Sequence, residues 1–276
     1  MNSIIYLSLL TVFTILLNKY FIKFNFLVSE TGDRHQKFAS NELVPLTGGI
    51  FIFLSYLYFI NNEILSFLLF SFLIFILGIF SDLKDIESAF KRFLIQISIV
   101  LMFVIFNDLQ LFNTKIYLLD KLLSNSIFNY IFVSFCILIV VNGSNFFDGL
   151  NTLSIGYYLL ISIAIFYLNQ NQIISVNEIF VEYLLIVLII IFVFNLINKI
   201  YLGDSGSYLL GFTFAVFLIK LYTDNQHLSP FFIIVLLWYP SYETLFSIIR
   251  KNIMNRSPMN PDSNHLHQQI FHLIKK

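Results

Sequence analysis

Four short polar segments interrupt an otherwise apolar chain, and their residue types are those that bind metal ions and phosphates. They comprise residues 82–85, 142–149, 203–207 and 265–267. Polar and ionisable groups at membrane depth are costly, so an apolar chain that retains them indicates a function. We therefore predict a site in which acids, amides and glycines meet a charged substrate.

The second segment has the most specific pattern, because Asn142, Asn145, Asp148 and Asn151 recur at every third position with two glycines between them. Carboxylate and amide oxygens suit hard cations, amides also pair with uracil-like rings, and glycines permit close backbone approach. The alternative is a turn between two membrane spans, since Asn-Gly and Asp-Gly are turn dipeptides. A plain turn does not require three amides and an acid, so the pattern favours binding.

Asp204 and Asp82 are the candidate catalytic and metal-binding acids. Asp204 precedes an apolar run, where helix N–H groups would face a phosphate and the acid would hold a metal ion. The alternative role of this acid is a helix N-cap, which is compatible with the first. Asp82 and Asp85 would share a face if the helix continued through both residues. With Lys91 and Arg92 they form either a metal and phosphate site or an ordinary solvated loop.

The remaining candidates lie near the end of the chain. His265 and His267 form a His-x-His pair, a pattern that is more often surface sequence than a metal site. No third soft ligand accompanies them, so zinc is not expected, and contact with a diphosphate is the functional alternative. Pro240 is expected to kink the last apolar run. Glu243 is predicted either to reach Arg250 or to line a lipid groove.

The composition sets the class of protein that must position these residues. The chain has 276 residues, of which 58% are hydrophobic and 12% charged, and its mean hydropathy is +0.83. A soluble domain would have about 25% charged residues. The net charge of zero gives no sign of nucleic-acid binding. The single cysteine, Cys136, excludes an intramolecular disulfide and a cysteine-rich metal site.

Apolar runs near the roughly 20 residues of a membrane-spanning helix recur along the chain. They cover residues 4–26, 43–60, 64–81, 93–107, 127–142, 153–169, 180–198, 207–223 and 230–250. We expect an all-α polytopic membrane protein with about nine to ten transmembrane helices and a single domain over residues 1–276. The first run is interpreted as an anchor rather than a signal peptide.

The distribution of Lys and Arg predicts the orientation of this protein. If the N-terminus is outside, thirteen of the sixteen basic residues fall in cytoplasmic segments and three in outer segments. This bias follows the positive-inside rule and predicts a cytoplasmic C-terminus. All four polar segments then lie at cytoplasmic ends of spans.

Taken together, these residues resemble the polyprenyl-phosphate N-acetylhexosamine-1-phosphate transferase family, which includes phospho-MurNAc-pentapeptide translocase and enzymes that start O-antigen and teichoic-acid linkage synthesis. The resemblance covers nearly the whole chain. It rests on Arg34 and His35, residues 45–49 and 78–85, Arg92, Gln96, and residues 142–151, 198–206, 238–240 and 265–267.

The resemblance implies a reaction at the inner face of a bacterial cytoplasmic membrane. Undecaprenyl phosphate attacks the β-phosphate of a UDP-N-acetylhexosamine, UMP leaves, and a lipid-diphosphate-sugar forms that initiates a surface polysaccharide. Phosphoryl transfer mainly requires positioning and charge neutralisation. The expected cofactor is Mg²⁺, with Mn²⁺ as an alternative. The partners are the two substrates, membrane lipids and a second copy of the chain in a homodimer.

The resemblance also implies roles for individual residues. Asp204, Asp82 and Asn145 would hold the metal ion, and the two acids would be catalytic. Lys91 and Arg92 would hold the lipid phosphate. The nucleotide and sugar diphosphate would be bound by Asn142, Asn145, Asp148, Asn151, His265 and His267.

The chain departs from the family pattern at three places. Ser81 replaces the first of two adjacent acids, Asn151 stands where many relatives have an aspartate, and a longer histidine cluster is common at His265. The serine leaves open an inactive family member that acts as a scaffold. A small transporter is the other alternative, but transporters place polar residues near the membrane midplane within repeats, and no repeat is visible here.

Overall fold

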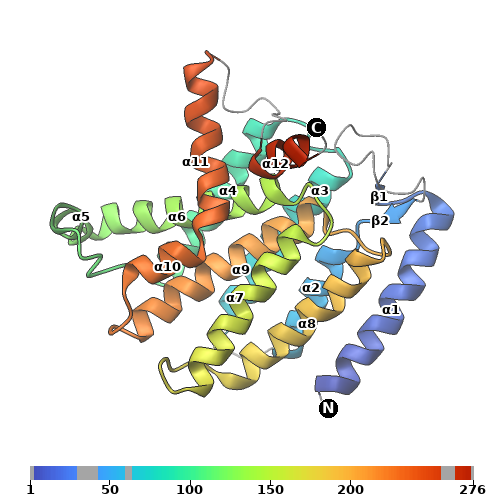
Figure 1. Cartoon of the computed structure of the whole chain (residues 1–276), viewed down its shortest axis with the longest axis horizontal. Coiled ribbons are helices and arrows are strands. Elements are labelled where there is room, and N and C mark those ends of the chain that lie inside the picture. The colour runs from blue at the N-terminus through green and yellow to red at the C-terminus, as the bar shows by residue number, and fades with distance from the viewer. Residues whose placement is uncertain (1–2, 30–42, 60–63, 256–264, 275–276) are drawn as a thin grey trace. The chain divides into compact units, whose positions relative to one another are not determined.

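The computed structural model describes residues 3–29, 43–59, 64–255 and 265–274, which are mainly helical (Figure 1). The chain forms two compact units. Unit 1 comprises residues 1–85 and 148–209, and unit 2 comprises residues 86–147 and 210–276. The helix α9 (Gly203–Asp224) begins in unit 1 and continues in unit 2.

Unit 1 contains the first three α-helices of the chain together with the later pair α7 and α8 and the start of α9. Its elements are α1 (Ser3–Phe24), β1 (Val28–Ser29), β2 (Val44–Pro45), α2 (Gly48–Tyr56), the 3₁₀ turn η1 (Leu57–Phe59), α3 (Leu65–Asp82), α7 (Leu153–Gln170), α8 (Glu178–Leu196) and the start of α9. The two short strands pair antiparallel, with Val28 opposite Pro45.

Unit 2 contains the helices between residues 86 and 147 and the described helices from residue 210 onward. Its elements are α4 (Ala89–Phe106), α5 (Tyr117–Leu123), α6 (Ser126–Phe147), the rest of α9, α10 (Pro230–Leu236), α11 (Trp238–Ile253) and α12 (Leu266–Ile274). The helix α6 packs against both α4 and α11.

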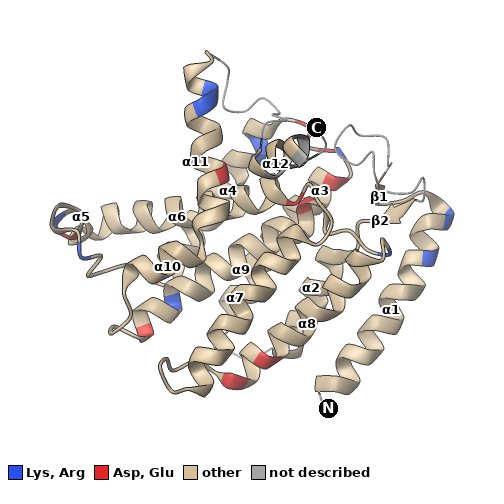
Figure 2. Ribbon diagram, viewed as in Figure 1, with Lys and Arg blue, Asp and Glu red and all other residues tan. Residues whose placement is uncertain are grey.

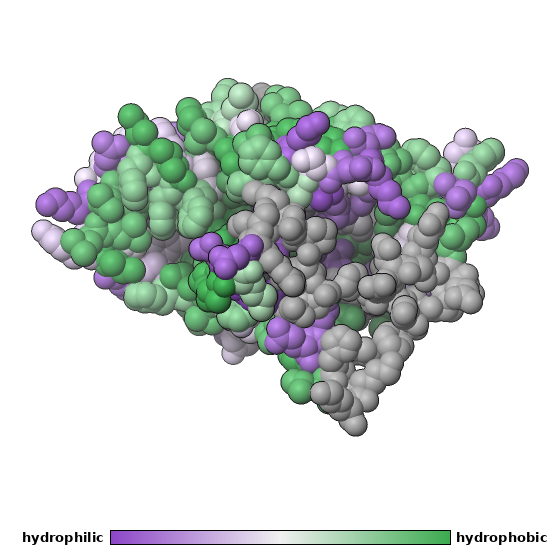
Figure 3. All heavy atoms as spheres, turned by 90° about the horizontal axis from the view of Figure 1, so that it is seen from above, coloured by the Kyte–Doolittle hydropathy of each residue, from purple (hydrophilic) through white to green (hydrophobic). Residues whose placement is uncertain are grey.

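Within the described ranges, seven helices are long and apolar enough to cross a membrane: α1, α3, α4, α6, α7, α8 and α9. The bent pair α10 and α11 would make eight. This confirms the predicted all-α polytopic membrane protein. Large apolar side chains such as Ile4, Leu9 and Leu16 on α1 are exposed, as expected for contact with lipid. Figure 3 likewise shows mostly hydrophobic atoms over the described surface in that view.

Two of the nine predicted spans differ from simple membrane-crossing helices. The run at residues 43–60 forms the apolar helix Gly48–Phe59, which is shorter than the roughly 20 residues of a full span. The last run is broken between α10 and α11 by a bend of 75°. Pro240 explains this break, because a proline lacks the N–H of a helical bond and clashes with the carbonyl four residues earlier, here Leu236. The kink predicted at Pro240 is therefore confirmed.

Small residues allow the α3 and α9 backbones of unit 1 to approach closely. A Cβ atom added at Gly78 would lie 2.3 Å from the Ser205 Cα and 2.6 Å from its backbone N. At Gly49 the added atom would lie 2.7 Å from the Gly206 N. Because backbone atoms cannot move aside as a flexible side chain does, these glycines fix where α9 begins relative to α3 and α2.

We expect Gly78→Ala to destabilise the protein by about 1–3 kcal/mol or more, because overpacking against backbone forces the helices apart. Gly156→Ala on α7 is the matched control. Its added Cβ would meet only the Phe192 ring, at 3.2 Å and 3.8 Å. Thermal unfolding of both variants in detergent tests the difference. Equal unfolding temperatures would show that the approach at Gly78 does not constrain the fold.

Candidate functional site in unit 1

The carboxylate of Asp82, at the end of α3, caps the N-terminus of α9. Its Oδ1 accepts the backbone N–H of Asp204 at 2.7 Å, and its Oδ2 accepts that of Ser205 at 3.1 Å. The first N–H groups of a helix have no partner within the helix, and the helix dipole favours an anion there. These contacts join Asp82 and Asp204, which lie 122 positions apart in the sequence.

This arrangement corrects one expectation from the sequence. The N–H groups at the start of α9 were predicted to face a phosphate, with a helix N-cap as the alternative role of Asp204. In the structure the cap is the side chain of Asp82, which already accepts the N–H groups of Asp204 and Ser205. The capping carboxylate comes from a distant helix, so local sequence around residue 204 could not reveal it.

Ser81 also contacts the Asp204 side chain. Its hydroxyl donates a hydrogen bond to Asp204 Oδ2, and Ser81 is buried. At the position where the resemblance implies an acid, this chain therefore has a neutral donor that holds the Asp204 carboxylate. A second acid there would face Asp204 with like charge, which is unfavourable without a cation between them.

Asp148 lies in the same electrostatic environment, directly after α6. Burial raises the pKa of its carboxyl well above the ordinary value, and the negative charges of Asp204 and Asp82 raise it further. Three acids from three places in the sequence therefore influence one another within unit 1. Such a cluster favours binding of a cation, which would relieve the repulsion among them.

The backbone around Gly203 shows why a glycine precedes Asp204. Gly203 has φ +68°, a left-handed conformation in which a side chain is strained. A Cβ atom there would also lie 2.7 Å from Asp82 Oδ2. Because glycine has no Cβ, it adopts this backbone conformation without strain and leaves room for the Asp82 carboxylate to reach the first turn of α9.

Two amides near the end of α8 organise the loop that carries Asp148. Asn195 Oδ1 accepts the backbone N–H of Thr152 at 2.5 Å, and its Nδ2 donates to the carbonyl of Ile200 at 2.9 Å. Asn151 donates from its side chain to Asn198 Oδ1. These bonds tie residues 148–152 to the segment that leads into Asp204. Sequence reasoning missed Asn195, although an amide inside an apolar helix is itself a signal.

A second set of polar contacts fixes the same segment from α1. Asn18 Nδ2 donates to the carbonyl of Lys199 at 3.2 Å, and Thr47 donates to Asn18 Oδ1 at 2.6 Å. The backbones of Pro45 and Gly48 also bond to Tyr201, each at 3.0 Å. The backbone of residues 45–49 therefore approaches this segment closely.

The other predicted residues lie in unit 2, at the end where α6 finishes. Asn142 donates to Gln96 Oε1 at 3.0 Å and to the carbonyl of Leu138 at 2.9 Å. Gln96 is 1% exposed, and its Nε2 has no hydrogen-bond partner in the described residues, so it is available to a ligand acceptor. Asn145 follows one turn later on α6, and Lys91 and Arg92 lie in the first turn of α4.

His265 is held at the same end of unit 2 by a buried acid. Its Nδ1 lies 2.9 Å from Glu243 Oε2, and the backbone N–H of Leu266 donates to Glu243 Oε1 at 2.8 Å. The His265 ring stacks on Phe146, with centroids 5.2 Å apart. The prediction that Glu243 reaches Arg250 or lines a lipid groove is wrong, because the end of the chain folds back and supplies its partners.

Several predicted residues fall outside the description. The side chain of His267 lies outside it, as do Arg34 and His35. Across the described ranges, no group of three or more His, Cys, Asp or Glu side chains is close enough to hold a metal ion by itself. A metal bound here would therefore need further ligands from a substrate or from water.

Helices that cross a membrane, with acids gathered at the ends of two of them, define a polytopic membrane protein with a polar site at helix termini. Residues 64–222, more than half of the chain, match the family model described as glycosyl transferase family 4. The chain belongs to this family.

Relatives in three organisms extend this result. The chain is 26% identical over 244 residues to a Bacillus subtilis (strain 168) protein named probable undecaprenyl-phosphate N-acetylglucosaminyl 1-phosphate transferase, covering 84% of this chain and 66% of that protein. It is 28% identical over 235 residues to a Thermotoga maritima undecaprenyl-phosphate alpha-N-acetylglucosaminyl 1-phosphate transferase, covering 84% and 70%.

A third relative, decaprenyl-phosphate N-acetylglucosaminephosphotransferase of Mycolicibacterium smegmatis, is 26% identical over 155 residues, covering 49% of this chain and 38% of that protein. The chain thus spans about two thirds of the length of the first two relatives and much less of the third. All three names specify a polyprenyl phosphate and an N-acetylglucosamine-type sugar phosphate.

Proposed function

We propose that this protein transfers an N-acetylhexosamine-1-phosphate, such as N-acetylglucosamine-1-phosphate, from its UDP derivative to undecaprenyl phosphate. The product would initiate synthesis of a cell-surface polysaccharide such as an O-antigen. The observation that carries the proposal is the acidic cluster of Asp82, Asp148 and Asp204. The family and the names of the relatives give the class of reaction.

The donor set fits Mg²⁺, or Mn²⁺ in its place. Carboxylate oxygens are ligands for these hard cations, and Mg²⁺ is commonly held by one or two carboxylates plus substrate phosphates. Asp204 and Asp82 would hold the ion, with Asp148 beside them. When bound, the ion would neutralise charge on the diphosphate. Asn145 was predicted as a further ligand, and that assignment remains a prediction.

The chain's own residues position the reacting groups in this proposal. An oxygen of the lipid phosphate attacks the β-phosphorus of the UDP-sugar, and the bond from that phosphorus to UMP breaks. Ser81 and the capped turn of α9 fix the Asp204 carboxylate. A lipid phosphate is largely ionised near neutral pH, so the chemistry does not require a separate base at position 81.

The first turn of α4 supports a role for Lys91 and Arg92 at the lipid phosphate. Ser88 caps this helix by accepting the Lys91 N–H, and two cations follow at the positive end of the helix dipole. Cations at that end are unfavourable unless an anion binds there. The amides Asn142, Asn145 and Asn151, with Asp148, His265 and His267, would contact the nucleotide, sugar or diphosphate.

The charges of unit 1 support placing its acidic site on the cytoplasmic face of a bacterial inner membrane. Its described cations lie near helix ends: Lys19 and Lys23 near the end of α1, Lys84 two residues after Asp82, and Lys199 just after α8, next to Asn18 of α1. Figure 2 shows the basic residues of α1 at its C-terminal end. Glu178 and Glu182 lie at the opposite end of α8. This distribution follows the positive-inside rule and fits an outside N-terminus.

The activity is tested with purified full-length protein in detergent. We expect UMP release and a lipid-linked sugar diphosphate from UDP-N-acetylglucosamine, undecaprenyl phosphate and Mg²⁺, and neither product without the lipid. A panel of UDP-sugars identifies the donor. Failure with every UDP-N-acetylhexosamine, combined with intact binding of the lipid phosphate, would favour the scaffold. Movement of a solute across vesicles without UMP release would favour the transporter.

A further inference from the structure

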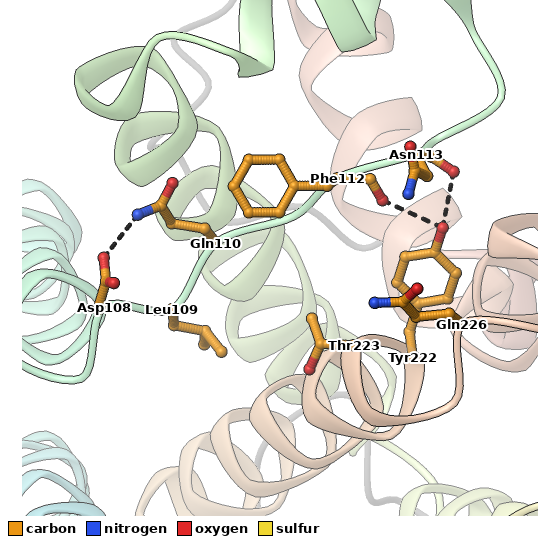
Figure 4. Close-up of a pocket in the computed structure, with 8 residues that line it drawn as sticks. All are labelled: Asp108, Leu109, Gln110, Phe112, Asn113, Tyr222, Thr223 and Gln226. Carbon is orange, nitrogen blue, oxygen red and sulfur yellow. Dashed lines mark hydrogen bonds between the residues drawn. The ribbon is translucent and has the colours of Figure 1, made fainter.

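Unit 2 contains a cavity of about 250 Å³ that the proposed transferase chemistry does not use (Figure 4). It is lined by the segment that follows α4 and by the last turn of α9 with the residues after it. It lies roughly 20 Å from Arg92 along α4, at about 1.5 Å per helical residue. It is therefore at the opposite end of α4 from the cations and Gln96.

The walls of this cavity are held in place by buried hydrogen bonds. Asn129 is 0% exposed, and its amide bonds to both backbone groups of Leu111, at 2.9 Å and 2.8 Å. The buried Tyr222 donates from its hydroxyl to the carbonyls of Asn113 at 2.7 Å and Phe112 at 3.2 Å. A segment fixed in this way has lost its conformational freedom before any ligand arrives, which favours binding.

Two of the polar side chains that line the cavity are uncommitted. The side-chain amides of Asn113 and Gln226 make no hydrogen bond with other residues of the described chain. Gln110 and Tyr130 both donate to Asp108 Oδ1, at 2.6 Å and 2.5 Å. Oδ1 is thus engaged, whereas Oδ2 remains free to accept. These bonds, that of Tyr130 first, lower the pKa of Asp108 below its ordinary value.

The apolar part of the lining consists of one buried aliphatic side chain and one exposed aromatic ring. Leu109 is buried, and the Phe112 ring is 53% exposed beside the polar groups (Figure 4). The negative face of an aromatic ring attracts polarised C–H groups. None of the described lining residues is Lys or Arg, so a phosphate would have no counter-charge.

We propose that this cavity binds one ring of an uncharged, hydroxyl-rich sugar. The amides of Asn113 and Gln226 and the carboxylate of Asp108 would pair with sugar hydroxyls, while Phe112 packs on its C–H face. At about 30 Å³ per water, the cavity holds roughly eight waters, which suits a ligand of single-ring size. In the orientation proposed above, the site faces away from the cytoplasm. The binding itself does not depend on the proposed transferase activity.

The ligand could be a free sugar or the head group of a glycolipid, and two probes distinguish these sources. The full-length protein is placed in nanodiscs of sugar-free phospholipid. Methyl glucoside and an alkyl glucoside are then titrated while saturation-transfer NMR records contact with the protein. Binding of both indicates a free-sugar site, whereas binding of the alkyl glucoside alone indicates a glycolipid head group. Tetramethylammonium, which has C–H groups but no hydroxyls, is expected to give no signal.

Variants locate any binding to this cavity. We expect Gln226→Ala combined with Asn113→Gly to weaken sugar binding at least tenfold. Glycine suits the left-handed backbone at position 113, where φ is 60°. Lys121→Ala, exposed on α5 and outside the lining, is the matched control, and Asp204→Asn should also bind normally. No binding in either probe arm, or binding unchanged in the double variant with normal unfolding, would overturn the proposal.

Discussion

Asp204→Asn is expected to lower the rate of sugar-phosphate transfer by about 10²–10³-fold while leaving the protein folded. The substitution removes one negative charge from the acidic cluster, and electrostatic stabilisation by a single positioned group is commonly worth about 10²–10³ in rate. Asparagine retains an oxygen that can accept the Ser81 hydrogen bond. The backbone N–H of residue 204, which Asp82 accepts, is unchanged.

Asp85→Asn is the matched control for this experiment. Asp85 is exposed just beyond α3, three residues after Asp82, and its side chain makes no hydrogen bond or ion pair with the described residues of α9. We expect its transfer rate to stay within about threefold of the unmodified protein, as for a surface change away from a site. Rates are measured as UMP release with saturating substrates, and unfolding temperatures verify the fold. A fully active Asp204→Asn protein would show that the metal assignment is wrong.

The sequence predicted the fold class and most of the polar residues for identifiable reasons. Apolar runs of spanning length and the asymmetry of basic residues are properties of local composition. The break before α11 could also be predicted from local sequence, because one proline determines which helical hydrogen bond is lost. The length of the helix predicted at residues 43–60 was overestimated, because an apolar run does not reveal where a helix begins within it. The structure has the shorter helix Gly48–Phe59.

The partners of the polar residues could not be predicted in the same way. Asp82 accepts the N–H groups of Asp204 and Ser205, and Ser81 donates to Asp204, across more than 120 positions in each case. Ser81 was interpreted only as a missing acid, because a hydroxyl at the end of an apolar run gives no indication of its acceptor. Asn195 was missed for a related reason: its two bonds join a loop and a segment whose proximity only the fold determines.

Glu243→Ala is expected to release α12 from α11 and to lower kcat/KM for the UDP-sugar by at least about 100-fold. Glu243 is 3% exposed and holds both the His265 ring and the Leu266 N–H. Its removal takes a hydrogen-bond partner from the buried His265 ring and from the partly buried Leu266 N–H, at a cost of about 1–3 kcal/mol each. Because about 1.4 kcal/mol changes an equilibrium tenfold, hydrogen exchange of α12 amides should accelerate by at least tenfold.

Two variants test whether the effect comes from the contacts that Glu243 makes or merely from the loss of one negative charge. Glu243→Gln keeps one acceptor oxygen, so we expect it to retain part of the α12 protection and to lose less activity than the alanine variant. Glu182→Gln, exposed on α8, should change neither quantity. Hydrogen exchange reports on α12 even if the transferase proposal fails, since it requires no substrate. Unchanged exchange in Glu243→Ala would refute the positioning role, whereas accelerated exchange with normal kcat/KM would show that His265 takes no part in donor binding.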